Sequence, residues 1–410
     1  MQLQVNVGRL QAELEELALF SDAPAPAVTR VVFSEADLRA RRWLKERCWA
    51  AGLLVREDAV GNTFARWNAG DGPAIGTGSH IDAIPNAGRY DGTVGVLGGL
   101  EAIRVLKESG FEPQRPIELL VFTSEEPTRF GIGCLGSRLL SGVLNDQQAS
   151  ALRDAAGASL EELRTAAGFG GALSSVRLPA DYYAAFVELH IEQGPLLEQA
   201  GVQIGLVTSI AAPASMRMLI EGEGGHAGAV LMPQRRDALT AAAEIILAVE
   251  QLALATGAID SVATTGICEV FPGAVNSIPS RVKLALDVRD TDLSRRDALV
   301  RGIGEAAESV VRMRALGLHI ELVNADAPAQ CDAGILDQLR KSCTAENVSY
   351  REMVSRAYHD SLFLSRIAPT AMVFIPCRGG VSHRPDEFAS LADIANGVRV
   401  LARTLAMLAQ

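Results

Sequence analysis

The sequence has few cysteines, and their spacing excludes two common uses of this residue. Six cysteines are scattered through 410 residues, and none of them forms a Cys-x-x-Cys pair. We therefore expect neither a disulfide framework nor a structural zinc site built from thiolates. The same pattern is typical of proteins from a reducing compartment.

The sequence also lacks an excess of basic charge and a long hydrophobic run. Lys and Arg number 38 against 49 Asp and Glu, a formal net charge of −11, so we expect neither nucleic acid nor an anionic membrane as a partner. The most hydrophobic stretch, ALTAAAEIILAV, is shorter than a bilayer span and contains Glu244. The N-terminal residues lack the basic and apolar regions of a signal peptide, and we expect a cytoplasmic protein.

Strand and helix patterns alternate in the first part of the chain. PAIGTGSHID reads as a strand that runs into a loop, DGTVGVLGGLEAIRVLKESG as a helix that ends at Gly110, and PIELLVFT as a second strand. This order predicts a layered α/β domain with a largely parallel sheet. Catalytic loops in such sheets follow the carboxyl ends of the strands.

A second pattern, β-α-β-β-α-β, begins near residue 212. It is the order of a ferredoxin-like fold, and its second helix has a candidate capping box at Ser294 and Asp297. We predict a first domain of residues 1–211 and 326–410, interrupted by an inserted domain of residues 212–325. The closing helix, SLADIANGVRVLARTLAMLA, has a candidate cap at Ser390 and Asp393.

Two adjacent acids, Glu125 and Glu126, lie in TSEEPTRFG, directly after the apolar strand IELLVF. Neighbouring residues of a strand point to opposite faces, so the two acids can share one site only where the strand has ended. The pair is either a solvated turn or a metal ligand beside a general base.

Histidines are also few, and five of the six lie beside Gly, Pro or acidic residues at expected strand ends and loops. His80 lies in GSHID, where Asp82 is placed to fix the second nitrogen of its ring. Taken singly, such histidines are usually only solvated. As a set with imidazole and carboxylate but no thiolate, these residues suit Zn²⁺, Mn²⁺ or Co²⁺: His80, Asp91, Glu126, His190 and His383.

The motifs resemble a known family along nearly the whole chain. They are DAVGNTFARW, GSHIDAIPNAGRYDG, ELHIEQGPLLE, GEGGHAGAVLMPQRRDA, GAVNSIPSRVKLALDVRD and GGVSHRPDEF. The chain resembles the dinuclear metallo-amidohydrolases, which include N-carbamoyl-L-amino-acid, allantoate and ureidoglycolate amidohydrolases within the wider aminoacylase and carboxypeptidase superfamily. This resemblance implies a metallo-aminopeptidase-like catalytic domain in residues 1–211 and 326–410 and a lid and dimerisation domain in residues 212–325. The stretches FTSEEPTRFGIGCLGSRLL, AAPASMRM and SRAYHDSLF look most like the ureidoglycolate amidohydrolases of plant purine breakdown.

The resemblance implies a role for each candidate metal ligand. His80 and His190 hold one divalent ion, Glu126 and His383 hold the other, and Asp91 bridges both. Mn²⁺ is the expected metal, with Zn²⁺ or Co²⁺ as alternatives. Glu125 is then the general base, which takes a proton from the attacking water and returns it to the leaving nitrogen.

The resemblance also implies contacts with a small ureide substrate that carries a carboxylate. His226 stabilises the oxyanion, reaching across a homodimer interface formed by the inserted domain. Arg289 binds the carboxylate, since it lies on the opposite strand face from Leu284, Leu286 and Val288. The other expected substrate contacts are Gln193, Asn276, Tyr358 and His359.

The expected reaction is hydrolysis of ureidoglycolate to glyoxylate, ammonia and carbon dioxide. An N-carbamoyl-L-amino acid or allantoate is the alternative substrate, and a non-catalytic binding protein on the same scaffold is the alternative class. Tyr358 and His359 bear most on the substrate, because a donor that binds the hydroxyl group of ureidoglycolate would discriminate against analogues that lack it.

Overall fold

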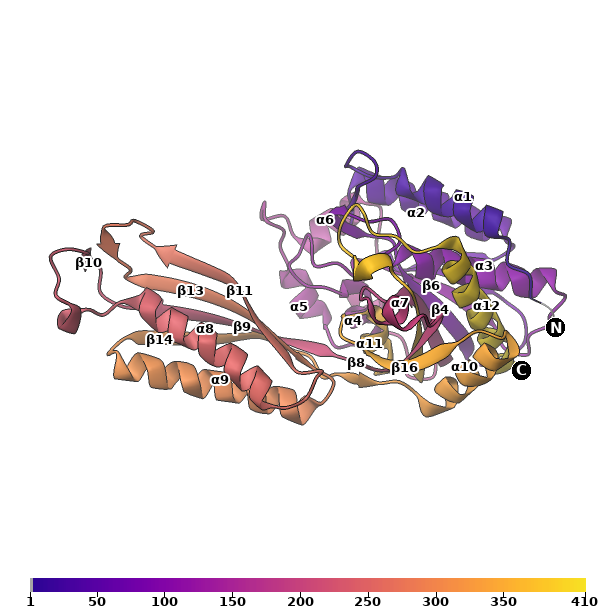
Figure 1. Cartoon of the computed structure of the whole chain (residues 1–410). Coiled ribbons are helices and arrows are strands. Elements are labelled where there is room, and N and C mark those ends of the chain that lie inside the picture. Colours follow the sequence, from indigo (N-terminus) through magenta and orange to yellow (C-terminus); the bar gives the residue numbers. More distant parts are fainter. Residues whose placement is uncertain (1–2) are drawn as a thin grey trace. The chain divides into compact units, whose positions relative to one another are not determined.

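The structure is a computed structural model that describes residues 3–410, and these divide into two compact units (Figure 1). Of the described residues, unit 1 holds those up to Thr208 together with Gln330–Ser355 and His359–Gln410. Unit 2 holds Ser209–Ala329 and the short segment Arg356–Tyr358. The insertion expected from the sequence spans 212–325 and does not include that short segment.

Unit 1 is built around a mixed sheet whose centre is parallel. Within residues 3–410 this sheet has nine strands in the order β15-β8-β17-β7-β4-β6-β3-β2, with β16 paired to β8. The neighbours β17, β7, β4 and β6 are parallel, and the outer pairs β17–β8, β6–β3 and β3–β2 are antiparallel. The predicted α/β fold with a largely parallel sheet is confirmed.

The strands of this sheet are β2 (Leu54–Glu57), β3 (Thr63–Trp67), β4 (Ala74–His80), β6 (Ile117–Phe122), β7 (Tyr183–Ile191), β8 (Ile204–Ile210), β15 (Ala329–Gln330), β16 (Tyr350–Ser355) and β17 (Thr370–Ile375). A separate two-stranded sheet pairs β1 (Val28–Arg30) with β5 (Ala83–Ala87).

Helices cover both faces of the sheet, which explains why every residue of β6 is buried and why all but Glu118 are hydrophobic. Ile117, Leu119 and Val121 pack into one buried cluster, and Leu120 and Phe122 pack into another. The longer helices are α1 (Val7–Ala18), α2 (Glu35–Ala50), α3 (Thr93–Glu108), α10 (Ala333–Ala345) and α12 (Leu391–Leu408). The shorter ones are α4 (Leu135–Ser141), α5 (Asp146–Ala151), α6 (Leu160–Ala166), α7 (Leu196–Ala200), α11 (Asp360–Leu364) and the 3₁₀ helices η1 (Leu173–Ser175) and η3 (Arg378–Gly380).

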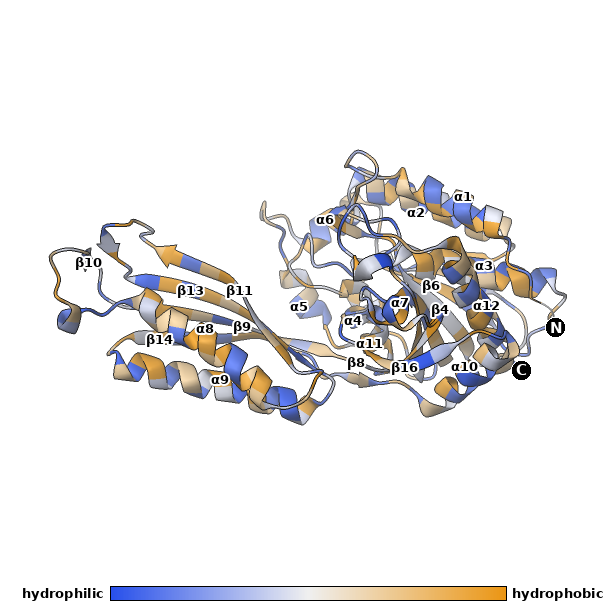
Figure 2. Ribbon diagram, in the orientation of Figure 1, coloured by the Kyte–Doolittle hydropathy of each residue, from blue (hydrophilic) through white to orange (hydrophobic). Residues whose placement is uncertain are grey.

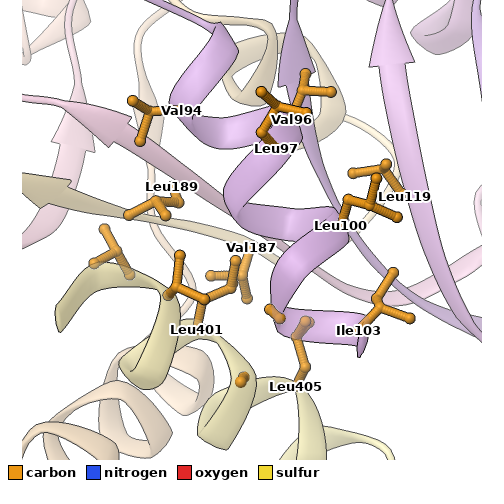
Figure 3. Packing of buried hydrophobic residues seen from close by; sticks show 14 of the residues in the cluster. Val94, Val96, Leu97, Leu100, Ile103, Leu119, Val187, Leu189, Leu401 and Leu405 are labelled. Atoms are coloured by element: carbon orange, nitrogen blue, oxygen red, sulfur yellow. The ribbon is translucent and has the colours of Figure 1, made fainter. Parts of the chain in front are cut away.

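Helices α3 and α12 pack side by side on β7 (Figure 3). Leu100 of α3, Leu189 of β7 and Leu401 of α12 are fully buried in this contact. The predicted cap of α12 is confirmed, because the side chain of Ser390 accepts a hydrogen bond from the Asp393 N–H. This packing fixes the start of α3 beside the ends of β4 and β7.

Unit 2 has an antiparallel sheet with the strand order β11-β13-β9-β14 over the residues that the structure describes. Its main elements follow the predicted β-α-β-β-α-β order: β9 (Ala212–Glu221), α8 (Ala238–Ala255), β11 (Val262–Phe271), β13 (Arg281–Asp290), α9 (Leu293–Met313) and β14 (Gly317–Ala325). A small antiparallel pair joins β10 (Gly225–His226) to β12 (Ser277–Ile278), and η2 (Met232–Gln234) follows β10.

The predicted capping box of α9 is wrong. The helix begins at Leu293, and its N-cap is Asp292, whose side chain accepts a hydrogen bond from the Arg295 N–H. Ser294 and Asp297 therefore lie within the helix. Asp caps a helix N-terminus as well as Ser does, and of the two neighbouring candidates Asp292 is the one that caps this helix, not Ser294.

Helix α8 is the one helix of the described chain that is long and apolar enough to cross a membrane. Its 18 residues extend beyond the hydrophobic stretch ALTAAAEIILAV, which by itself is shorter than a bilayer span. In Figure 2 it is more uniformly hydrophobic than α9. The helix packs on β11 and on α9, and Ile245 and Val249 lie in the core of unit 2, so a core helix of a folded domain accounts for its composition.

Candidate metal and catalytic site

The candidate site lies at the carboxyl ends of the four central parallel strands. His80 is the last residue of β4, and His190 is next to last in β7. Glu125 and Glu126 follow β6, and His383 lies in the loop that follows β17 and η3. Because parallel strands end at one edge of the sheet, residues far apart in the sequence meet there.

Asp91 joins two groups of possible ligands. Its Oδ1 lies 3.6 Å from His80 Nε2 and 3.2 Å from His190 Nε2. Its Oδ2 lies 3.2 Å from His383 Nε2, which is 3.6 Å from Glu126 Oε1. Within each group the ligand atoms all lie within 4.8 Å of one another. The two oxygens of the Asp91 carboxylate thus face different groups: Oδ1 faces His80 and His190, and Oδ2 faces His383 and Glu126.

The rings of His80 and His190 are turned so that Nε2 faces Asp91. His80 Nδ1 is 3.0 Å from the carbonyl oxygen of Asp82, and His190 Nδ1 is 2.9 Å from the carbonyl oxygen of Ile191. A second nitrogen held in this way fixes the orientation of a metal-binding imidazole.

The carboxylate of Asp82 has a different role from the one expected. It is 3.7 Å from His80 Nδ1, farther than the carbonyl oxygen of the same residue. Instead it accepts hydrogen bonds from the backbone N–H groups of Glu125 (3.2 Å) and Glu126 (3.0 Å). Asp82 therefore links the end of β4 to the turn that carries both acids.

This turn explains how two adjacent acids reach one site. Strand β6 ends at Phe122, and Ser124 has φ 57°, the left-handed conformation that non-glycine residues rarely adopt. Glu126 faces His383, whereas Glu125 Oε2 lies 3.7 Å from His80 Nε2. Glu125 Oε1 accepts a long hydrogen bond of 3.5 Å from Cys134 Sγ.

The site concentrates negative charge in a buried position. Burial raises the pKa of Glu125 well above its ordinary value, and the charge of Glu126 adds to this effect. Burial and the charge of Asp91 raise the pKa of Glu126 to about 7. Burial opposes ionisation of Asp91 too, but hydrogen bonds with His190, His383 and His80 outweigh it and hold the pKa of Asp91 well below its usual value.

The donors fit a pair of divalent cations. The hydrogen bond with Asp91 raises the pKa of His383 to about 9, as expected for an imidazole that faces carboxylates. Imidazole nitrogens and carboxylate oxygens without thiolate suit Zn²⁺, Mn²⁺ and Co²⁺. Positive ions in both groups would supply the charge that these buried carboxylates lack.

A third group, Glu188, His190 and His359, also brings its ligand atoms within 4.8 Å of one another. Its members already have other partners, however. The oxygens of Glu188 accept hydrogen bonds from Ser79 (2.7 Å) and Ser361 (2.5 Å), and His359 Nε2 is 3.0 Å from Ser355 Oγ. We interpret this group as a hydrogen-bonded support beneath His190.

Gln193, an expected substrate contact, contacts Asp91 in the structure. Its Nε2 donates to Asp91 Oδ2 at 2.8 Å, while its buried Oε1 has no hydrogen-bond partner among the described residues. The residue has φ 57°, a conformation that aims the side chain at the site at some cost in backbone strain.

Tyr358 and His359 are sequence neighbours that belong to different units. In unit 2, the Tyr358 hydroxyl donates to Asp326 Oδ2 at 2.6 Å. In unit 1, His359 is buried and meets the ring of His190 edge-on, with ring centroids 4.6 Å apart. His359 is thus placed beside an expected metal ligand, and Tyr358 is placed within unit 2.

The other expected contacts lie in unit 2. His226 pairs with Ser277 across β10 and β12, and Asn276 accepts a backbone hydrogen bond from Ala227, so His226 and Asn276 lie close together. Arg289 faces away from the core as predicted, and its Nε is 2.7 Å from Asp287 Oδ1.

Sequence reasoning missed two residues that touch Asp91. Glu387 accepts hydrogen bonds from the Tyr90 and Asp91 N–H groups, and the Ser382 hydroxyl lies 3.0 Å from Asp91 Oδ2. Both flank His383 within the motif GGVSHRPDEF, which attracted attention only for its histidine.

Residues 76–407 match the model of the family described as peptidase family M20/M25/M40. The chain belongs to this family. Ureidoglycolate hydrolase from Arabidopsis thaliana, a relative of this M20 chain, is 52% identical over 417 residues, which cover 99% of this chain and 87% of its own. N-carbamoyl-L-amino acid amidohydrolase from Geobacillus stearothermophilus is 38% identical and covers 98% of each chain.

A solved structure supports the same relationship. The crystal structure of AtUAH in complex with glyoxylate matches this M20 chain with a TM-score of 0.89 at 51% identity, and the match covers 99% of this chain and 98% of that one. The predicted resemblance to the metallo-amidohydrolases, and to the ureidoglycolate branch in particular, is confirmed by these relatives.

Proposed function

We propose that this M20 chain hydrolyses the ureido C–N bond of ureidoglycolate. The choice of substrate rests on sequence identity. The chain is 52% identical to a ureidoglycolate hydrolase across 99% of its length, whereas it is 38% identical to the N-carbamoyl-L-amino acid amidohydrolase. With one water, complete breakdown of ureidoglycolate gives glyoxylate, two ammonia and carbon dioxide.

His80 and His190 would hold one divalent ion, Glu126 and His383 would hold the other, and Asp91 would contact both. The two groups that share Asp91 support this assignment. Bound dications lower the pKa of water from about 15.7 toward about 7 and polarise the carbonyl of the substrate. Mn²⁺ is the proposed metal, and the donor set suits Zn²⁺ or Co²⁺ as well.

Glu125 is the proposed general base. Its carboxylate is buried beside His80 but does not belong to either group that shares Asp91. It would take a proton from the attacking water and pass it to the departing nitrogen. Because burial raises the pKa of Glu125, its carboxyl group is suited to hold that proton between the two steps.

Residues of unit 2 complete the proposal. Arg289 would bind the substrate carboxylate; in the structure its Nη1 donates a 3.2 Å hydrogen bond to the carbonyl oxygen of Arg356, and its Nε and Nη2 contact Asp287. Asn276 would contact the substrate, and the neighbouring His226 would donate a hydrogen bond to the developing oxyanion. Gln193 and His359 of unit 1 would also contact the substrate, and Tyr358 of unit 2 would bind its hydroxyl group.

The proposed assembly is a cytoplasmic homodimer formed through unit 2, with neither nucleic acid nor membrane as a partner. Exposed hydrophobic side chains support the interface: Leu247 is 58% exposed and Leu254 is 74% exposed on α8, and Ile267 is 52% exposed on the edge strand β11. A monomer in analytical ultracentrifugation at micromolar concentration would contradict the dimer.

The substrate assignment is tested by ammonia release in the presence of Mn²⁺ from three compounds: ureidoglycolate, allantoate and an N-carbamoyl-L-amino acid. We expect the highest kcat/KM for ureidoglycolate, with glyoxylate as a second product. Equal or faster turnover of the carbamoyl amino acid would contradict the assignment.

Two neighbouring variants separate catalysis from metal binding. Glu125→Gln should retain both metal ions and lose at least a hundredfold in kcat, the lower end of the usual contribution of general acid–base catalysis. Glu126→Gln should lose metal as well as activity. A Glu125→Gln protein that keeps the activity of the unchanged protein would remove the proposed base, and retained metal without any turnover of the unchanged protein would favour a binding protein.

A further inference from the structure

Glu387 is a buried acid that the proposed mechanism does not use. It lies between η3 and α12, in the same loop as His383, and is 4% exposed. A carboxylate in such a position requires hydrogen-bond donors, because an unpartnered buried charge is strongly unfavourable.

The donors to Glu387 all belong to the surroundings of Asp91. Glu387 Oε1 accepts from the backbone N–H of Tyr90 (2.8 Å) and from the backbone N–H of Asp91 (3.1 Å). Ser382 Oγ lies between the two carboxylates, 2.9 Å from Glu387 Oε2 and 3.0 Å from Asp91 Oδ2, and its one hydroxyl hydrogen can be donated to either of them. Glu387 thus reaches the main chain of Asp91 directly and its side chain through Ser382.

These contacts connect two loops, which are also joined by the 3.2 Å contact of His383 Nε2 with Asp91 Oδ2 and by the edge-on ring contact of Tyr90 with Phe388. Asp91 lies between β5 and α3, and His383 lies between β17 and α12. His80 and His190, by contrast, are residues of the strands β4 and β7, whose backbones are held by the sheet. The position of Asp91 relative to His383 therefore depends on loop-to-loop contacts such as those of Glu387.

Gly88 packs against Glu387 from the other side. A Cβ atom at position 88 would lie 2.4 Å from Cβ and from Oε1 of Glu387 and 2.5 Å from its Cδ. Gly88 does not have a positive φ, so this position requires glycine for space and not for backbone conformation. The absence of a side chain there leaves the room that Glu387 occupies.

We propose that Glu387 is a positioning residue that holds Asp91 in the place where its second oxygen meets His383 and Glu126. This inference rests on the proposed function, since it assumes that the two groups bind metal ions. Glu387, against which Gly88 packs, would thus set the geometry of the second metal site, which consists of Asp91, Glu126 and His383.

The test is a Mn²⁺ titration of the metal-free full-length protein by isothermal titration calorimetry. Two sites are expected in the unchanged protein. Glu387→Ala should leave the first site within threefold of its original affinity and weaken the second at least tenfold. Gly88→Ala should give the same result while Glu387 is still present, because the new methyl group displaces its side chain.

Rescue by the conservative variant separates positioning from a loss of folding. In Glu387→Gln, Oε1 can still accept from both backbone N–H groups and Nε2 can donate to Ser382, so binding of both ions should stay within about threefold. Asp386→Asn is the matched control, since this neighbouring acid is exposed and pairs with Arg384. Its affinities should not change.

Electron paramagnetic resonance supplies a readout that does not depend on turnover. A protein with two adjacent Mn²⁺ ions should show an exchange-coupled spectrum, and Glu387→Ala at the same loading should show mainly isolated ions. Glu387→Ala and Gly88→Ala that both bind two coupled ions with unchanged affinity would overturn the inference. Absence of Mn²⁺ binding in the unchanged protein would instead overturn the proposed function.

Discussion

At the scale of single residues, Asp91 organises the candidate site, because its two oxygens face the two groups of possible ligands. The four other expected ligands lie near Asp91 because β4, β6, β7 and β17 end at one edge of the sheet, whereas Asp91 itself follows the short strand β5, which the sequence did not predict. The partners of Asp82 and Gln193 were not predictable. These contacts depend on the positive φ angles of Ser124 and Gln193. Ser and Gln rarely adopt a positive φ, so the sequence does not predict this conformation at either position.

Asp290 provides a residue-scale prediction in unit 2. Its side chain is fully buried and accepts hydrogen bonds from Ser261, from Arg295 and from the Asp292 N–H. Burial alone would raise the pKa of Asp290, but these bonds outweigh it and lower that pKa below the ordinary 3.8. We expect Asp290→Asn to lower the free energy of unfolding by about 1–3 kcal/mol at pH 7, because it weakens a hydrogen-bonded buried charge.

The pH dependence of this effect has a definite sign. A carboxyl group whose pKa is lowered by folding stabilises the protein above its unfolded pKa, and that contribution is lost as pH falls through the folded pKa. Urea unfolding of both proteins should therefore show a difference at pH 7 that narrows below about pH 4. Glu244→Gln is the control, since the Glu244–Arg314 pair is exposed and should contribute less than about 1 kcal/mol. A difference that stays constant with pH would show that charge is not the cause.

At the scale of elements, periodicity predicted α3, α8, α9 and α12, and it missed the long helices α1, α2 and α10 as well as the short helices α4 to α7. Val96, Leu100 and Ile103 of α3 lie in one buried cluster, but residues 93–106 of α3 are all buried, so its pattern is broader than a stripe. Helices of five to seven residues, such as α4 and α7, contain too few turns to produce a period and are held by tertiary contacts.

Gly95 of α3 provides a prediction at this scale. A Cβ atom there would lie 2.3 Å from the carbonyl oxygen of Leu189 in β7 and 2.6 Å from Cβ of Ser79 in β4. Both neighbours belong to the sheet and cannot move aside easily. Gly95→Ala should therefore push the start of α3 away from the strand ends, and the overpacking cost of about 1–3 kcal/mol should exceed the gain of up to about 1 kcal/mol in helix propensity.

Gly304 of α9 is the matched control, because the same substitution in a helix interior meets open space. The nearest atom to a Cβ at this position is Ile320 Cδ1 at 3.9 Å. Gly304→Ala should leave stability unchanged or raise it by up to about 1 kcal/mol. Chemical denaturation of the two variants measures both effects. If Gly95→Ala proved as stable as Gly304→Ala, the close approach of α3 to β7 would be refuted.

At the scale of the whole molecule, the sequence predicted both folds and an inserted domain of residues 212–325, and it did not predict that Arg356–Tyr358 belongs to unit 2. The ferredoxin-like order could be predicted because the main helices and strands of unit 2 are long enough for each to show its own hydrophobic periodicity. Arg356–Tyr358 joins unit 2 through side-chain contacts, such as that of Tyr358 with Asp326, which no local pattern encodes.

Division into two units with separate hydrophobic cores leads to a prediction about metal. All five proposed ligands belong to unit 1, and the core of unit 2 is a separate cluster. A ligand that binds only the folded form stabilises it by about 2.7 kcal/mol at a hundredfold excess over its Kd. Mn²⁺ should therefore stabilise unit 1 and leave the local stability of unit 2 unchanged.

Hydrogen exchange followed by mass spectrometry can resolve this difference along the chain. Addition of Mn²⁺ to metal-free protein should slow exchange in peptides from β4, β6 and β7 and not in peptides from β11 and β13. Leu284→Ala is a useful control: it should destabilise unit 2 by about 2–5 kcal/mol, because the side chain is 1% exposed in that core, while the Mn²⁺ effect on unit 1 persists. If Mn²⁺ protected both units equally, the two cores would unfold as one cooperative body, and the metal site would stabilise the entire chain.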